Sequence, residues 1–220
     1  MNLLEMRGAW DPLHARLFDF FIARRLTPLH ERLAREIAPR LPDTGRVLEV
    51  GCGAGRVTVL LARRRPHVEL TGLDLSATMI DLARKQGAGT PNVFFRVGDA
   101  MRLPCDDDAF DGAFSISSIK HWPDPARGVR EMARVVRPGG MVFVLEADAA
   151  CSRAVAAGFV ARWYMPAPLR PLATEYFLRV VAAQGLEASA LRRFLEDAGL
   201  HDVQAASDTT DPAAYAFGKR

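Results

Sequence analysis

The stretch that decides the fold covers residues 47–55 and reads Val47-Leu48-Glu49-Val50-Gly51-Cys52-Gly53-Ala54-Gly55. Its first four residues are typical of a short buried strand, and three alternate glycines follow directly. Glycine lets the backbone approach a ligand closely, and the helix expected after Gly55 offers free N–H groups at its N-terminus. The pattern therefore predicts a strand, a ligand-binding loop and a helix, and it indicates a nucleoside-type ligand.

The spacing of these glycines separates two classes of nucleotide-binding loop. A dinucleotide-binding loop has a third glycine where this chain has Arg56, and that glycine permits close packing of the helix on the strand. The arginine therefore argues against a dinucleotide. Because a tight turn without a ligand can have the same composition, the loop alone is a weak signal.

Residues 46–146 alternate between short strand-like runs and helical periodicity, which is typical of a parallel sheet with crossover helices. Ser76 and Asp124 are expected N-caps, and Asp124 is followed by a proline that suits the first helical turn. Glycines 139 and 140 should end the helix that Asp124 begins. Strands are expected at residues 47–50, 68–75, 93–97, 110–119, 141–146, 203–207 and 214–218.

We expect one domain, residues 1–220, with an α/β fold and helices on both faces of the sheet. A helical N-terminal cover (1–45) precedes the core (46–146), a lid (147–188) contains a helix at 172–184, and a helix with two closing strands (189–220) follows. In the N-terminal cover, the helical signal comes from Leu17, Phe18, Phe21 and Ile22.

Two carboxylates follow neighbouring strands of this sheet. Asp74 comes roughly 20 residues after the glycine loop, where a carboxylate can accept hydrogen bonds from both hydroxyls of a ribose. Asp99 ends the next strand, where its side chain can accept from an exocyclic amine while the N–H of Ala100 donates to a ring nitrogen, as adenine requires. Because the carboxyl ends of parallel strands share one crevice, we expect these groups beside the glycine loop.

Composition excludes several other classes. The chain has 29 Lys plus Arg against 26 Asp plus Glu, and this small excess is spread along the sequence, which disfavours a nucleic-acid footprint. The three cysteines have no disulfide or zinc spacing, no run reaches the ~18 apolar residues of a membrane span, and no export signal is recognisable. We therefore expect a cytoplasmic protein, and the preference for arginine over lysine indicates a bacterial source.

Five stretches resemble successive motifs of class I S-adenosylmethionine-dependent methyltransferases: residues 47–55, 72–76, 98–104, 110–115 and 134–140. The greatest similarity is to the methyltransferase type 11 group, which includes ubiquinone and menaquinone C-methyltransferases. The resemblance covers residues 46–146 and, more loosely, the C-terminal part, but neither covering segment. It implies S-adenosylmethionine as cofactor, S-adenosylhomocysteine as product, and a Rossmann-like sheet of seven strands whose last strand is antiparallel.

Residue by residue, the resemblance implies a cofactor site in which the glycine loop flanks the methionine end. Glu49 would hold the methionine ammonium, directly or through water, Asp74 the ribose, and Asp99 with Ala100 the adenine. Leu75 and Ser115 belong to the matched motifs and are further cofactor-binding candidates. In full, the implied cofactor-binding residues are Glu49, Gly51, Gly53, Gly55, Asp74, Leu75, Asp99, Ala100 and Ser115.

The methyl acceptor leaves a weaker signal. His121 follows the fourth strand at the mouth of the crevice, and its ordinary pKa near 6.5 suits a general base, although a histidine at this turn is common in the group whatever the acceptor. Aromatic residues in the covering segments and beside His121 can wall an acceptor pocket, or can simply pack there. Our candidates for acceptor binding are Trp10, Trp122, Trp163 and Tyr164.

Three functions remain open at this point. The leading interpretation is methyl transfer to a small molecule. A phospholipid or quinone methyltransferase at a membrane surface is the second, prompted by Phe18, Phe20, Phe21 and Ile22 beside Arg24 and Arg25. The third is a catalytically silent protein that binds S-adenosylmethionine. A nucleic-acid partner is least favoured, and the acidic run 106–108 is expected to be a solvated loop, not a metal site.

Overall fold

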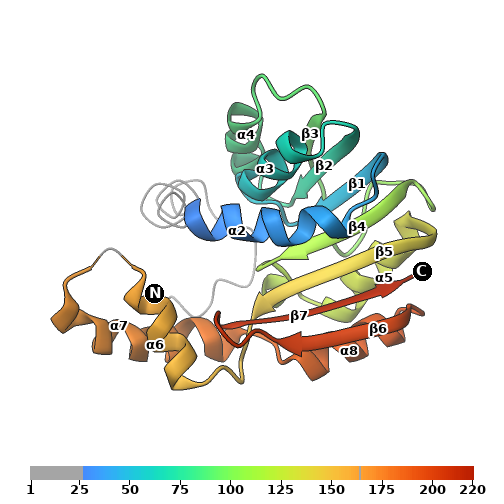
Figure 1. Cartoon of the computed structure of the whole chain (residues 1–220). Helices are drawn as coiled ribbons and strands as arrows, with labels where there is room; N and C mark the ends of the chain where they lie inside the picture. Colours follow the sequence, from blue (N-terminus) through green and yellow to red (C-terminus); the bar gives the residue numbers. More distant parts are fainter. Residues whose placement is uncertain (1–26, 164) are drawn as a thin grey trace.

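The computed structural model describes residues 27–163 and 165–220. One sheet has the strand order β3-β2-β1-β4-β5-β7-β6 (Figure 1). Strands β1 to β5 run parallel, and β7 is antiparallel to both of its neighbours, which confirms the expected antiparallel closing strand. The strands are β1 (Gly45–Val50), β2 (Val68–Asp74), β3 (Val93–Val97), β4 (Phe110–Ile116), β5 (Val136–Ala147), β6 (His201–Ser207) and β7 (Ala213–Lys219).

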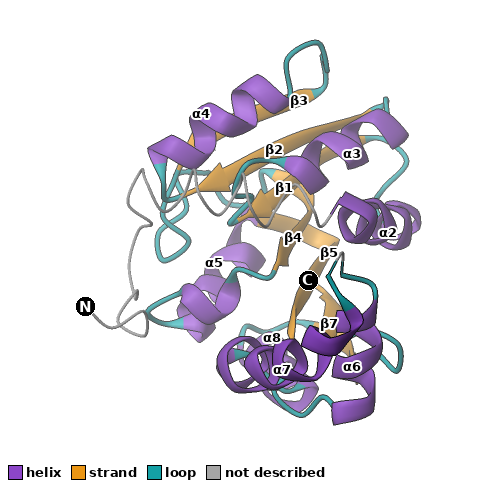
Figure 2. Cartoon of the chain, turned by 90° about the vertical axis from the view of Figure 1, so that its left-hand side faces the viewer, coloured by secondary structure: helices purple, strands orange, loops and turns teal. Residues whose placement is uncertain are grey.

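Helices cover both faces of this sheet. One face packs against α2 (Thr27–Ile37), α3 (Arg56–Arg64) and α4 (Ala77–Gln86). The other packs against α5 (Pro125–Val135) and α8 (Ala188–Asp197). Figure 2 looks onto the edge where the parallel strands end. Strand β5 shows why both faces are apolar: Val142 and Val144 belong to the core under α5 and α8, whereas Phe143 and Leu145 belong to the core under α2.

Both expected N-caps are present. The Ser76 hydroxyl accepts a hydrogen bond from the Met79 N–H at 3.4 Å and begins α4. The Asp124 carboxylate accepts from the Arg127 N–H at 2.9 Å and begins α5. Each cap satisfies an N–H group that has no partner inside its helix, so the local sequence sets where these helices begin.

Two strand boundaries differ from the sequence-based expectation by three residues or more. Strand β4 ends at Ile116, three residues early, because Ser117 takes a left-handed conformation (φ 51°) and a 3-10 turn follows at Ile119–His121. Strand β5 begins at Val136, not at residue 141. The expectation that glycines 139 and 140 end the preceding helix is therefore wrong, because that helix ends at Val135 and both glycines lie within β5. The register of β5 on β4 shifts near its start, and Gly139 (φ 81°) donates its N–H to the Arg220 carbonyl at 2.6 Å, so Gly139 and Gly140 form an irregularity within the strand.

The lid folds on a small core of its own. It contains α6 (Arg153–Ala161), a 3-10 turn (Ala167–Leu169) and α7 (Arg170–Tyr176), which continues as a π-helix (Phe177–Val181) and a 3-10 turn (Ala182–Gln184). The expected helix at 172–184 is therefore continuous but changes its hydrogen-bonding pattern twice. Its core is made by Ala156, Val160, Ala173, Phe177 and Ala182.

Two of the contacts among the described residues show how the lid is held. Where it rejoins the core, the Leu186 N–H donates to the Ala147 carbonyl at 2.9 Å. At its other side, the buried Asp211 carboxylate pairs with Arg162 at the end of α6 and with Arg32 of α2. The loop between β6 and β7 thereby links the N-terminal helix to the lid. Within the described ranges, no helix is long and apolar enough to cross a membrane. The helical signal around Leu17 lies outside the described residues.

Two glycine substitutions in the lid should have opposite effects on stability. A Cβ at Gly185 would lie 2.0 Å from the Ala147 carbonyl oxygen, so Gly185→Ala should lower the free energy of unfolding by about 1 to 3 kcal/mol. Gly158 lies exposed inside α6, where a Cβ would meet no described atom within 4 Å. Gly158→Ala should raise that energy by roughly 0.5 to 1 kcal/mol. Urea unfolding measures both, and equal effects would contradict the close approach at Gly185.

Candidate active site

The glycine loop has a left-handed backbone at all three glycines, with φ of 76° at Gly51, 53° at Gly53 and 72° at Gly55. The N–H groups of Gly51 and Cys52 both donate to the Leu73 carbonyl on β2, at 2.7 and 2.9 Å. A Cβ at Gly51 would lie 1.9 Å from the Ser118 hydroxyl, and one at Gly55 would lie 2.6 Å from the Phe95 ring. Packing within the protein therefore accounts for these two glycines.

Gly53 is different. A Cβ there would meet no atom of the described residues within 4 Å, although the loop around it is tightly held. The neighbouring Cys52 is buried, as expected for a thiol without a chemical role. The left-handed φ of 53° favours glycine at position 53, and the open space around it leaves the backbone accessible to a ligand. This exposed stretch of backbone fits the methionine end of the cofactor that the sequence implies.

The Asp74 carboxylate joins the glycine loop to the end of β2. One oxygen accepts a hydrogen bond from the Gly53 N–H at 2.8 Å, and the other accepts from the Ser76 N–H at 2.9 Å. Burial raises the pKa of this carboxyl, and both hydrogen bonds act in the opposite direction. Each carboxylate oxygen can accept a second bond, so Asp74 can bind two hydroxyl groups while it holds the loop.

Glu49 lies beneath the loop and is buried. The Thr58 hydroxyl of α3 donates to its carboxyl group. Burial, with a smaller contribution from the charge of Asp74, raises the pKa of Glu49 to about 8. Glu49 therefore carries a proton at neutral pH, and a nearby ammonium group would favour its ionised form.

The next strand ends carry the residues expected around adenine. The Leu75 side chain is exposed, and the Gly98 N–H donates to the Asp74 carbonyl at 2.9 Å, which brings the end of β3 against the end of β2. Asp99 is exposed, and its carboxylate accepts from the Met101 N–H at 2.8 Å. An apolar wall and a carboxylate thus lie on adjoining strand ends, as a purine requires.

The expectation that the Ser115 side chain lines this site is wrong. Ser115 lies within β4 and has no exposed surface, and its hydroxyl donates to the Val50 carbonyl on β1 at 2.8 Å. Because β4 is a central strand with both faces covered, a polar side chain there must bond within the protein. Ser115 therefore joins two strands below the crevice.

His121 lies exposed in the 3-10 turn after β4. Its backbone N–H donates to the Ser118 carbonyl at 3.0 Å. Surrounding protein atoms and the charge of Lys120 lower the pKa of its imidazole, whereas Glu146 acts to raise it. The imidazole is therefore neutral at pH 7, the form that can accept a proton.

A buried ion pair beside His121 was not predicted from the sequence. Glu146, at the end of β5, has no exposed surface, and the Lys120 ammonium lies 2.8 Å from its carboxylate. The backbone N–H of Lys120 donates to the same carboxylate at 3.2 Å. The only signal in the sequence is a glutamate at the carboxyl end of a predicted strand, and its partner lies 26 residues away.

The aromatic candidates have separate locations. The Trp122 indole donates to the Ser118 hydroxyl at 3.0 Å and packs on α5, where a Cβ at Gly128 would lie 2.3 Å from the ring. Trp163 packs in the lid core against Phe159 and Phe177, with ring centroids 5.8 and 6.3 Å apart. Trp10 and Tyr164 lie outside the described residues. An acceptor-binding role for these four residues stays a prediction.

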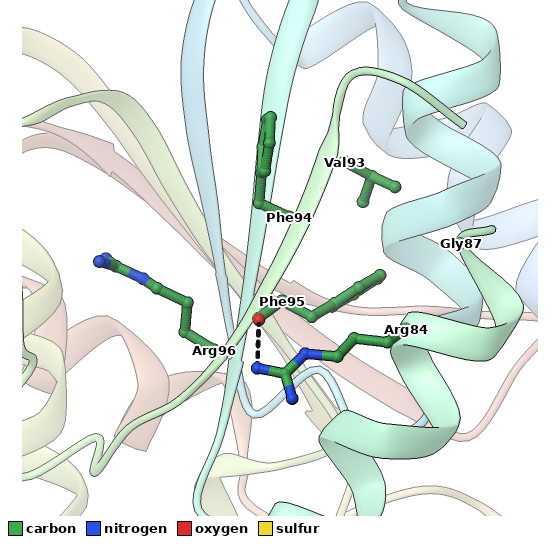
Figure 3. A pocket seen from close by; sticks show the side chains of 6 residues that line it. All are labelled: Arg84, Gly87, Val93, Phe94, Phe95 and Arg96. Atoms are coloured by element: carbon green, nitrogen blue, oxygen red, sulfur yellow. Dashed lines mark hydrogen bonds between the residues drawn. The ribbon is translucent and has the colours of Figure 1, made fainter. Parts of the chain in front are cut away.

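A shallow hollow at the outer edge of the sheet is separate from these residues. Figure 3 shows it between β3 and α4, with Phe94 and Arg96 on one side of the strand and Phe95 on the other. Arg84 donates to the Phe95 carbonyl at 3.3 Å, which occupies one acceptor of the edge strand. None of the predicted site residues lines this hollow.

The strand order and the antiparallel closing strand are those of the class I S-adenosylmethionine-dependent methyltransferase fold. Residues 48–144, a little under half of the chain, match the family model described as "Methyltransferase domain". S-adenosylmethionine is the cofactor of the class.

Two curated relatives and one solved structure illustrate the similarity. The chain is 41% identical over 102 residues to a demethylmenaquinone methyltransferase of Deinococcus radiodurans, covering 46% of this chain and 42% of the relative. It is 39% identical over 130 residues to an O-methyltransferase of Aspergillus nomiae, covering 55% and 56%. The matches therefore span about half the length of these relatives. The structure of an S-adenosylmethionine-dependent methyltransferase from Methanococcus maripaludis superposes with a TM-score of 0.72 at 18% identity, covering 97% and 94%, and supports the fold.

The raised pKa of Glu49 predicts that the stability of the wild-type protein falls as pH rises from about 4.5 to about 8. In this window the folded protein retains the Glu49 proton, whereas the unfolded chain has already released it, so unfolding becomes more favourable with each step in pH. Glu49→Gln, which has no proton to lose, should gain stability relative to wild type across that window. Urea unfolding at several pH values tests this. The exposed Glu187→Gln variant should follow wild type, and parallel curves for all three proteins would contradict the burial argument.

Proposed function

We propose that this protein transfers a methyl group from S-adenosylmethionine to a small-molecule acceptor. The observation that carries the proposal is the Asp74 carboxylate, which bonds to the Gly53 N–H beside the open backbone of the loop. A ribose and a methionine tail need these two features side by side. The names of the two relatives, an O-methyltransferase and a demethylmenaquinone methyltransferase, support a small acceptor.

On the cofactor side, this chain's residues bind and orient. Asp74 would accept bonds from the ribose hydroxyls, Asp99 and Ala100 would hold the adenine edge, and Leu75 would pack against its face. Glu49 would hold the methionine ammonium, directly or through water, and a cation beside it would favour its ionised form. When bound, S-adenosylmethionine supplies an electrophilic methyl group on a sulfonium. Positioning and exclusion of water therefore make up most of the catalysis.

On the acceptor side, His121 takes the proton that a hydroxyl or acidic carbon loses on methylation. Its lowered pKa keeps the imidazole neutral at pH 7. The Lys120–Glu146 pair holds the turn that carries His121, because the carboxylate bonds both the side chain and the backbone of Lys120. The lid roofs the crevice, and Trp163 and Trp122 are the acceptor-binding candidates among the described residues.

Isothermal titration calorimetry tests whether S-adenosylmethionine is the cofactor. The wild-type protein should bind S-adenosylmethionine and S-adenosylhomocysteine, and it should not bind NAD. Asp74→Ala should weaken binding by roughly 1 to 3 kcal/mol, because it removes one partner of a partly buried hydrogen-bond network. The control is Asp81→Ala on the exposed surface of α4, which should bind as wild type does. Unchanged affinity in Asp74→Ala, or tight binding of NAD, would overturn the site.

Radiolabelled methyl transfer to a panel of phenols, hydroquinones and amines tests the reaction. With a phenol or hydroquinone acceptor, His121→Ala should lower kcat by roughly 10²-fold or more, while affinity for S-adenosylmethionine stays near wild type. The exposed His67→Ala variant should keep full activity. Activity of His121→Ala within a few-fold of wild type would remove the general base from the mechanism, and no transfer to any acceptor would favour a silent binding protein.

A further inference from the structure

An apolar stripe lies on the outer face of the lid. Leu169, Leu172 and Tyr176 are 50%, 72% and 54% exposed. Their spacing of three and four residues places them along one side of the turn and helix that run through α7. Ala173 of α7 and Phe177 of the π-helix that follows it are buried in the lid core, on the face next to the stripe. The helix is thus apolar over a broad part of its circumference, and only one part of this surface is covered within the described parts of the chain.

The surroundings of this stripe are basic. The lid, residues 147–188, contains four arginines and three acidic residues, a net charge of +1, but its segment 153–179, which carries the stripe, contains all four arginines and a single glutamate. The one glutamate, Glu175, is paired with both Arg153 and Arg179. The side chains of these two arginines are 65% and 81% exposed, whereas that of Glu175 is 33% exposed. The lid therefore presents exposed leucine and tyrosine together with two exposed arginines that share one carboxylate.

We propose that the stripe Leu169, Leu172 and Tyr176, with the arginines of the lid, docks on an anionic lipid membrane. Leucine and tyrosine bury apolar surface at the boundary between head groups and acyl chains, and arginine pairs with lipid phosphate. The charge around the stripe favours one occupant over another. A second copy of this chain docked through the same face would bring the exposed Arg153 and Arg179 of two lids together, whereas an anionic bilayer complements them.

The two ends of the lid lie close to the proposed acceptor side of the crevice. They lie at Ala147 and Leu186, at the end of β5 beside Glu146 and the turn of His121. A docked lid therefore brings the acceptor side of the crevice to the membrane surface, where an apolar acceptor can enter from the bilayer. The docking itself needs neither cofactor nor acceptor, so it is tested independently of the proposed function.

Vesicle co-sedimentation of the full chain tests the proposal. The wild-type protein should bind vesicles of phosphatidylcholine with about one third phosphatidylglycerol, bind phosphatidylcholine alone at least 10-fold more weakly, and dissociate as salt rises. The double variant Leu172→Ser/Tyr176→Ser should lose at least 5-fold in affinity. The control is Phe94→Ser, which removes an aromatic side chain of similar exposure from β3 and should bind as wild type does.

A second pair of variants tests the charge without touching the apolar stripe. Arg179 and Arg192 each pair with a glutamate four residues away, one on the lid and one on α8. Arg179→Gln should weaken binding to anionic vesicles about threefold, and Arg192→Gln should not. Residues 18–25, which prompted the membrane-surface alternative from the sequence, are the same in every variant. Circular dichroism and thermal unfolding verify that each variant is folded.

Three results would overturn the proposal. The first is equal vesicle binding by wild type and the double variant, which would assign any membrane affinity to another part of the chain. The second is an absence of binding to anionic vesicles. The third is self-association of the wild type in sedimentation velocity that the double variant loses without any change in vesicle binding, which would identify a second copy as the occupant of the stripe.

Discussion

The site depends on the two hydrogen bonds that the Asp74 carboxylate accepts. This carboxylate accepts the Gly53 N–H with one oxygen and the Ser76 N–H with the other, and so it fixes the loop after β1 to the helix start after β2. Without this link, a left-handed glycine loop would have many conformations available. The same group thus shapes the site and remains able to bind hydroxyls, because each oxygen has a second acceptor position.

Two buried glutamates near the crevice have different surroundings. Among the described residues, the groups that shift the pKa of Glu49 are the Thr58 hydroxyl and the Asp74 carboxylate, and burial raises this pKa to about 8. Glu146 is buried as completely, but Lys120 lies 2.8 Å away. A buried carboxyl without a cation is therefore kept neutral, whereas one with a lysine partner forms an ion pair. The first is ready for a cationic ligand, and the second holds a turn in place.

Much of the fold could be predicted from the sequence, because strands, caps and glycines act over short distances. Ser76 and Asp124 cap their helices through residues three positions away, and the alternation of apolar runs identifies the parallel sheet. What could not be predicted depends on partners distant in sequence or on burial. Ser115 looked like a site residue, but it lies in a strand covered on both faces, and the Lys120–Glu146 pair joins two separate strand ends.

The attachment of the lid allows this segment to vary without harm to the fold. The lid leaves the sheet after Ala147 and returns at Leu186, and these two residues are hydrogen-bonded to each other at 2.9 Å. An inserted segment whose ends meet costs the surrounding chain little entropy of closure and can be longer, shorter or replaced altogether. The sheet and the cofactor-binding loop can thus stay constant over evolution while successive lids are exchanged upon them.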